Sequence, residues 1–239
     1  MPTLGGALVR LEPATRDHVT ALAAIRRSPQ VHDFWRGGDD LVAAVNEDLQ
    51  EPGSTPYVIE CDGRVVGWIQ WSAEDDPDYR YASIDIYLDP AVHGRGLGTD
   101  AVRTMARHLI DDHGHHRLEI DPAADNVAAI RCYSKVGFRP VGIRRNSERG
   151  NDGSWHDGLL MDLLAAELSW FPMGLGCQGG VATGTVDWPH EPRDWLAGWP
   201  RSGARRSARG GAIQLDGRGA RPTLTNSSSL RPPPETDGM

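Results

Sequence analysis

Residues 93–98 read His-Gly-Arg-Gly-Leu-Gly, with a glycine at every second position between a strand-like and a helix-like segment. The first peptide N–H groups of a helix have no partner inside it and carry the positive end of the helix dipole. Glycines let such a backbone curl closely around an anion. The stretch therefore predicts a phosphate loop, although a glycine-rich turn with a purely structural role fits these six residues equally well.

The segments on either side of this loop follow strand and helix patterns. In residues 83–88 apolar and polar positions alternate, which places Ile84 and Ile86 on one face of a strand and Asp85 on the other. Beyond the loop, apolar residues recur at helical spacing in residues 102–110. The loop is therefore expected to join a strand to a helix.

The rest of residues 1–168 continues this alternation. Asp62 and Gly63 predict a hairpin turn, and Gly137 predicts the end of a helix. We expect an α/β (α+β) domain with a mixed, mainly antiparallel central sheet flanked by about four helices. Further strands are expected at 7–11, 57–61, 65–71, 117–121, 138–144 and 154–163, and further helices at 15–27, 41–49 and 126–136.

Residues 169–239 differ in character from the residues before them. They contain runs such as GARRSARGG and TNSSS and keep neither a strand nor a helix period. We interpret them as a low-complexity, disordered tail, because they lack the apolar surface that offsets the entropy of ordering a chain. Two alternatives stay open: an interaction tail using Trp188, Trp195 and Trp199, or a reading frame that continues past the natural stop.

Charge and composition limit the classes of molecule that the chain is expected to bind. The chain has a net charge of −8, and residues 169–239 carry 8 Arg and 6 acidic residues, so residues 1–168 have a net charge of −10. This negative charge disfavours binding to nucleic acid and favours binding of a cationic ligand, although a negative charge also increases solubility. No apolar run is long enough to span a membrane, and three distant cysteines suggest neither disulfides nor a metal site. We expect a cytoplasmic protein, monomeric or homodimeric.

Two common phosphate-binding motifs do not match this loop. A Walker loop needs a lysine followed by Ser or Thr after its last glycine, and none follows Gly98. A dinucleotide fingerprint needs G-x-G-x-x-G in a parallel βαβ unit, whereas here the third glycine comes after one residue and hairpin strands precede it.

The loop resembles the Q/R-x-x-G-x-G/A loop of the GCN5-related N-acetyltransferases (GNAT family), with His93 in place of Gln or Arg. A second motif, NVAAIRCYSKVGF at residues 126–138, is similar to the N-x-x-A…Y-x-K-x-G-F helix of that family. The resemblance covers about residues 7–163. It implies the GNAT fold, with acetyl-coenzyme A as co-substrate and its pyrophosphate in the loop. Contacts to acetyl-coenzyme A are implied for Tyr87, Leu88, His93, Gly94, Arg95, Gly96, Leu97, Gly98, Thr99, Asn126, Ala129 and Lys135.

Acetyl transfer to an amine needs a neutral amine beside the thioester, a base for its proton and an acid for the departing sulfur. Asp85 lies at the centre of the strand before the loop, and Asp121 ends the next strand. In the family order these two strands flank the site of acetyl delivery, so both carboxylates are candidates to hold and deprotonate the amine. The structural alternatives for Asp85 are pairing with an arginine and a position on the solvent face of the sheet. Tyr133 matches the family tyrosine that protonates the thiolate. Because the amine attacks directly, Cys132 is interpreted as a packed helix residue.

Several segments are more specifically similar to the aminoglycoside 6′-N-acetyltransferases: residues 32–38, 55–57, 67–70, 84–85, 94–99, 121–122 and 129–133. This resemblance implies that Asp85 acts at the accepting amine, that Asp121 holds the polycationic sugar and that Tyr133 is the acid. It makes Trp35, Tyr57, Gln70 and Asp152 candidates for the sugar pocket. Packing explains Trp35 and Tyr57 equally well, and turn formation alone explains Asp152.

Two other functions remain open. The same chemistry serves another amine, such as a protein N-terminus or a siderophore precursor. The second alternative belongs to a different functional class: a noncatalytic module that binds acetyl-coenzyme A.

Overall fold

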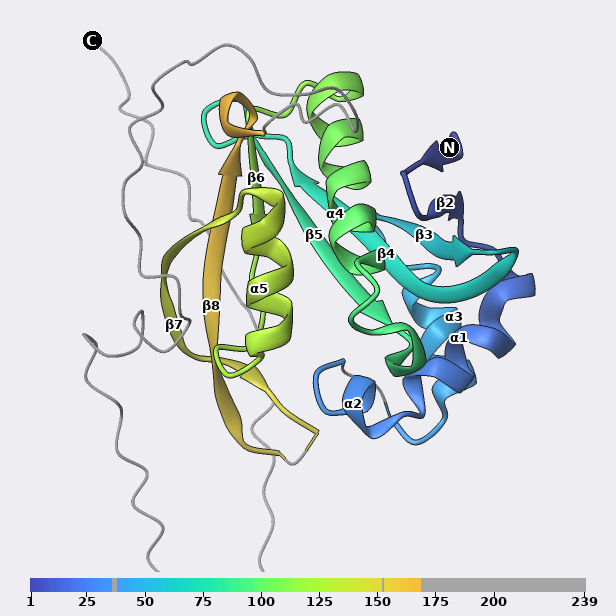
Figure 1. Ribbon diagram of the computed structural model, residues 1–239. Coiled ribbons are helices and arrows are strands. Elements are labelled where there is room, and N and C mark those ends of the chain that lie inside the picture. The colour runs from blue at the N-terminus through green and yellow to red at the C-terminus, as the bar shows by residue number, and fades with distance from the viewer. Residues whose placement is uncertain (36–37, 152, 169–239) are drawn as a thin grey trace, which may run out of the picture. The chain divides into compact units, whose positions relative to one another are not determined.

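The computed structural model describes residues 1–35, 38–151 and 153–168. Within them, eight strands form one sheet in the order β1-β2-β3-β4-β5-β6-β8-β7 (Figure 1). The strands are β1 (Leu4–Gly5), β2 (Arg10–Pro13), β3 (Ser54–Cys61), β4 (Arg64–Glu74), β5 (Tyr81–Leu88), β6 (Arg117–Ile120), β7 (Arg139–Arg149) and β8 (Trp155–Leu164). The α-helices are α1 (Val19–Arg26), α2 (Pro29–His32), α3 (Leu41–Asp48), α4 (Leu97–Arg107) and α5 (Val127–Val136). The predicted mixed, mainly antiparallel fold is confirmed.

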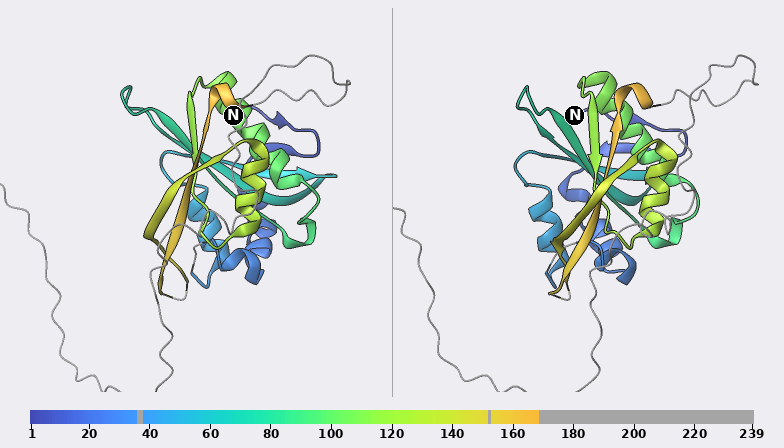
Figure 2. Two further views of the ribbon diagram at one scale, coloured as in Figure 1. Left: turned by 60° about the vertical axis from the view of Figure 1, so that its left-hand side comes forward. Right: turned by 90° about the vertical axis from the view of Figure 1, so that its left-hand side faces the viewer.

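The helices cover both faces of the sheet (Figure 2). On one face, α4 and α5 pack over a core that includes Ile84, Met105 and Ile130. On the other, α1 and α3 pack over a smaller core that includes Trp68 and Tyr87. Ile84 and Tyr87 on β5 therefore point to opposite faces, as the alternation in residues 83–88 predicts.

The sheet opens between β5 and β6, the parallel pair. Only two residue pairs connect β5 and β6, Ala82 with Leu118 and Ser83 with Glu119, although β5 continues to Leu88. The two strands then diverge, with α5 beside the opening (Figure 1). The exposed strand ends and the loops that follow them therefore meet around one gap.

The hairpin between β3 and β4 forms where the sequence predicts it. Asp62 and Gly63 both have positive φ, 52° and 72°, as a two-residue turn of this kind requires. Gly137 likewise ends α5 with a φ of 123°.

The first predicted strand, at residues 7–11, is wrong in position. The structure has β1 at Leu4–Gly5 and β2 at Arg10–Pro13 instead. The buried carboxylate of Asp100 in α4 accepts hydrogen bonds from the N–H groups of Leu8 (2.6 Å) and Val9 (3.1 Å). These two residues therefore bind a helix side chain rather than a neighbouring strand.

Other element boundaries also differ from the expectations. The helix expected at 15–27 begins with a 3₁₀ turn at Arg16–His18, so that α1 itself starts at Val19. The α2 helix was not predicted, and five α-helices therefore stand in the described part where about four were expected. The helix α4 continues as a π-helical turn at His108–Asp112. The predicted tail at 169–239 lies outside the described residues. Within the described residues, no helix is long and apolar enough to cross a membrane.

Candidate active site

One cleft of about 860 Å³ occupies the gap between β5 and β6. Its walls come from the end of β5, the glycine loop with the start of α4, the segment after β6, and α5. Residues of α2, α3 and β7 complete the lining of the cleft. Of the residues expected to contact acetyl-coenzyme A, the cleft is lined by Tyr87, Leu88, His93, Gly94, Gly96, Leu97, Gly98, Thr99, Asn126, Ala129 and Lys135.

The loop backbone has the conformation that its glycines permit. Gly94 and Gly96 adopt φ values of 76° and 84°, a region that residues with a side chain rarely enter. Gly98 is tightly surrounded, because an added Cβ would lie 3.0 Å from the Leu88 side chain and 3.3 Å from the Cys132 Sγ, and these side chains would have to shift. Gly96 is the N-cap of α4, so the first N–H groups of that helix point toward the cleft without partners inside the helix. This arrangement suits a pyrophosphate.

The side chains of His93 and Arg95 make different contacts. The His93 Nε2 atom lies 3.3 Å from the Leu88 carbonyl oxygen and so ties the loop to the end of β5. Arg95 does not line the cleft; its guanidinium lies 3.9 Å from the Asp62 carboxylate in the hairpin turn. The expected contact between Arg95 and acetyl-coenzyme A stays a prediction, which the backbone N–H of the loop can satisfy while the side chain lies near this turn.

The start of α5 forms the opposite wall. The Asn126 side chain accepts a hydrogen bond from the Ala129 N–H (3.1 Å) and caps the helix. Cys132, one turn later, has its Sγ 3.4 Å from the Thr99 hydroxyl, and burial raises the pKa of this thiol. A raised pKa disfavours the thiolate, in agreement with a packing role for Cys132.

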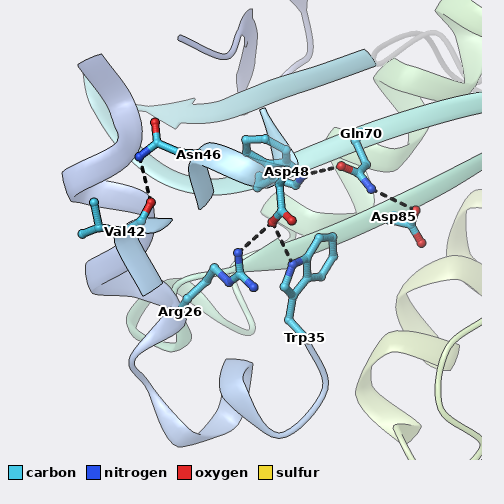
Figure 3. Close-up of polar contacts among 8 residues, drawn as sticks. Arg26, Trp35, Val42, Asn46, Asp48, Gln70 and Asp85 are labelled. Carbon is cyan, nitrogen blue, oxygen red and sulfur yellow. Dashed lines mark hydrogen bonds and ion pairs between the residues drawn. The ribbon is translucent and has the colours of Figure 1, made fainter. Parts of the chain in front are cut away.

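Asp85 lines the cleft from β5. Burial raises the pKa of Asp85 to about 6, while the hydrogen bond from Gln70 opposes this shift and the carboxylates of Asp121, Glu51 and Glu148 add to it. The Gln70 amide donates to Asp85 (3.3 Å) and accepts from the Trp68 indole (3.1 Å) (Figure 3). A carboxylate with a pKa near 6 is mostly ionised at pH 7 and remains a useful base.

Tyr133 faces the cleft from α5. Its side chain is only 6% exposed, and burial raises its pKa above the ordinary value. The phenol therefore keeps its proton at neutral pH and is available as an acid.

Asp121 follows β6 on the other side of the cleft from β5. Its side chain is 41% exposed and forms an ion pair with Arg144 of β7. This pairing was not predicted. It links the segment after β6 to β7, whose residues Arg144, Ser147 and Glu148 also line the cleft.

The four residues expected in the sugar pocket fall in different places. Trp35 and Gln70 line the cleft. Tyr57 does not; it is 1% exposed and packs with Ile59 on the α4 face of the sheet, because its position on β3 directs it away from the Asp85 face. The assignment of Tyr57 to the pocket is corrected to core packing. Asp152 lies outside the described residues.

The described residues contain no group of three or more His, Cys, Asp or Glu side chains placed to hold a metal ion.

Comparisons with known proteins identify the family. The model of the acetyltransferase (GNAT) family matches residues 22–138. The N-alpha-acetyltransferase RimI of Mycobacterium tuberculosis is 31% identical over 140 residues, which are 58% of this chain and 86% of that protein. The chain belongs to the GNAT family. The resemblance seen in the loop and in residues 126–138 is thereby confirmed.

Other GNAT relatives carry more specific names. The aminoglycoside N(6′)-acetyltransferase type 1 of Klebsiella pneumoniae is 34% identical over 128 residues, 45% of this chain. The match spans only 63% of the length of that relative. The structure of AAC(6′)-Ib in complex with paromomycin and acetyl-coenzyme A superimposes with a TM-score of 0.56 at 26% identity, covering 67% of this chain and 96% of that one.

Sequence reasoning missed an ion pair between α1 and α3 beside the cleft (Figure 3). Arg26 of α1 is 1% exposed and donates to the Asp48 carboxylate of α3 at 2.7 Å. The same Asp48 oxygen accepts from the Trp35 indole (3.4 Å), whose ring packs edge-on against Tyr87. The available signal was Arg26 itself, which lies four residues after Leu22 on the apolar face of the predicted helix.

Replacing Arg26 with methionine is expected to destabilise the fold by about 3 kcal/mol, because Asp48 would lose its buried partner. Urea unfolding measures this change. The double variant Arg26→Met, Asp48→Asn removes the stranded charge and is expected to recover part of the loss. Unchanged stability of Arg26→Met would contradict this account of the pair.

Proposed function

We propose that the chain transfers the acetyl group of acetyl-coenzyme A to a primary amine of an aminoglycoside, with 6′ regiochemistry, by direct attack in a ternary complex. One observation carries the proposal. A single cleft contains an anion-binding helix start, a carboxylate with a pKa of about 6 and a protonated tyrosine.

The chemistry assigns one proton transfer to each of two side chains. The neutral amine attacks the thioester carbonyl, forming the amide C–N bond as the C–S bond breaks. Asp85 takes the proton lost by the amine, directly or through a water molecule, and Tyr133 protonates the departing thiolate. Gln70 orients the Asp85 carboxylate through its hydrogen bond. The backbone N–H groups of the loop at 94–99 hold the pyrophosphate, and this contact positions the thioester.

The aminoglycoside assignment is supported by the charge of the acceptor side and by the similar proteins. The carboxylates of Asp48, Glu51, Asp121 and Glu148 line the cleft around Asp85. Such a surface attracts a substrate with several ammonium groups. Two of the proteins described above are named as aminoglycoside enzymes or contain paromomycin.

A second candidate is acetylation of a protein N-terminus. It is favoured by the likeness to the mycobacterial RimI, of which this chain covers 86%. An extended peptide acceptor needs a groove along the strands. A peptide with one terminal amine would also contact fewer of the cleft carboxylates than an aminoglycoside with several amines.

An acceptor panel separates these functions. Release of the coenzyme A thiol is measured for the full chain with kanamycin, with tobramycin, with an aminoglycoside bearing a 6′-hydroxyl in place of the amine, and with an N-terminal peptide. We expect turnover of the first two alone. Turnover of the peptide alone would replace the aminoglycoside assignment, and tight binding of acetyl-coenzyme A without turnover of any amine would indicate a noncatalytic module.

A further inference from the structure

Glu51 lies at the acceptor end of the cleft, just after α3 and before β3. Its N–H donates to the Asp48 carbonyl (3.3 Å), and its own carbonyl accepts from Ser54 (3.2 Å), so the backbone forms a fixed turn. The residue is exposed and lines the same cleft as Asp85. The turn therefore places Glu51 at the cleft, and its side chain stays open to solvent.

The other carboxylates named in the cleft have contacts of their own. Asp48 pairs with Arg26, Asp121 with Arg144, and Asp85 accepts from Gln70, while Glu148 has further interactions. Within the described part of the chain, Glu51 has neither an ion pair nor a side-chain hydrogen bond. Its charge nevertheless reaches the centre of the site, since it raises the pKa of Asp85 and of Asp48.

We propose that Glu51 determines acceptor specificity by binding a second ammonium group of the acceptor while the reacting amine lies at Asp85. This inference rests on the proposed function. An acceptor with one amine gains nothing from Glu51, whereas one with several amines places two cations against two carboxylates. Glu51 therefore distinguishes polyamines from single-amine acceptors and takes no part in the proton transfer.

The test compares Glu51→Gln with Glu47→Gln in the full chain. Glu47 lies on α3 one turn earlier, is exposed and does not line the cleft, so its variant removes the same charge outside the site. The acceptors are kanamycin and methyl 6-amino-6-deoxyglucoside, a sugar with one primary amine. Steady-state KM and kcat/KM are measured for both acceptors and for acetyl-coenzyme A.

For Glu51→Gln we expect an approximately 10-fold rise in KM for kanamycin, since one charge-assisted hydrogen bond is lost. The kcat/KM of the single-amine sugar and the KM for acetyl-coenzyme A should stay within about twofold. The lower pH limit of kcat/KM should also move toward lower pH, because a charge that raises the Asp85 pKa is gone. Glu51→Asp should retain much of the affinity for kanamycin, and Glu47→Gln should behave like the unaltered chain.

Three results would overturn the proposal. Equal losses for kanamycin and for the single-amine sugar would assign Glu51 to general acceptor binding or to structure. Equal behaviour of Glu51→Gln and Glu47→Gln would remove any specific role while leaving the proposed function intact. No turnover of kanamycin by the unaltered chain would overturn this inference and the proposed function together.

Discussion

Replacing Asp85 with asparagine is expected to lower kcat by about 10²- to 10⁴-fold, the usual contribution of a positioned base. Asparagine keeps the size of the side chain and can still meet Gln70, but it cannot accept the amine proton. The KM for acetyl-coenzyme A should remain within about twofold, because the loop that holds the pyrophosphate lies on a different element. Steady-state kinetics at pH 7.5 with kanamycin measure both values.

The pH profile of the unaltered chain provides a second measurement. Asp85 acts as a base only when ionised, and its pKa is raised to about 6. The value of kcat/KM should therefore fall steeply below pH 6, where Asp85 becomes protonated. Asp78→Asn, in the exposed turn between β4 and β5, is the matched control and should keep full activity. Survival of the rate in Asp85→Asn would contradict the assignment of the base.

Replacing Gly96 with valine is expected to raise the KM for acetyl-coenzyme A by at least about 10-fold. Gly96 has a φ of 84° at the start of α4, where a β-branched residue costs about 1–3 kcal/mol. The backbone would relax toward negative φ and turn the loop N–H groups away from the pyrophosphate. Isothermal titration calorimetry with acetyl-coenzyme A measures the lost affinity, and kcat at saturation should change little.

The control for Gly96→Val is Gly63→Val. Gly63 has a comparable φ of 72°, an added Cβ there meets no atom within 4 Å, and the residue lies in the β3–β4 turn outside the cleft. Both variants carry the same backbone strain, but only Gly96→Val should lose affinity for acetyl-coenzyme A. Equal affinities in the two variants would show that the loop backbone does not bind the coenzyme.

Local patterns predicted most of the sheet and the coenzyme side of the cleft. The alternation in residues 83–88, the Asp62-Gly63 turn and the glycines at 94, 96 and 98 each express a requirement that a few neighbouring residues impose on the backbone. The α2 helix was missed because its four residues carry too little of a helical period to detect. The first strand was misplaced because its competitor for hydrogen bonds, Asp100, lies more than 90 residues away.

The sequence alone determined the strand–loop–helix unit around the glycines, the helix at 126–136 with its end at Gly137, and the acidic character of residues 1–168. These are properties of neighbouring residues and of composition. Only the tertiary structure decided that Arg26 and Asp48 pair behind Trp35, that Arg144 holds Asp121, and that Tyr57 belongs to the core. Such contacts join segments far apart in the chain, and their geometry depends on how the helices pack on the two faces of the sheet. For the same reason, the ionisation of Asp85 is a property of the assembled cleft.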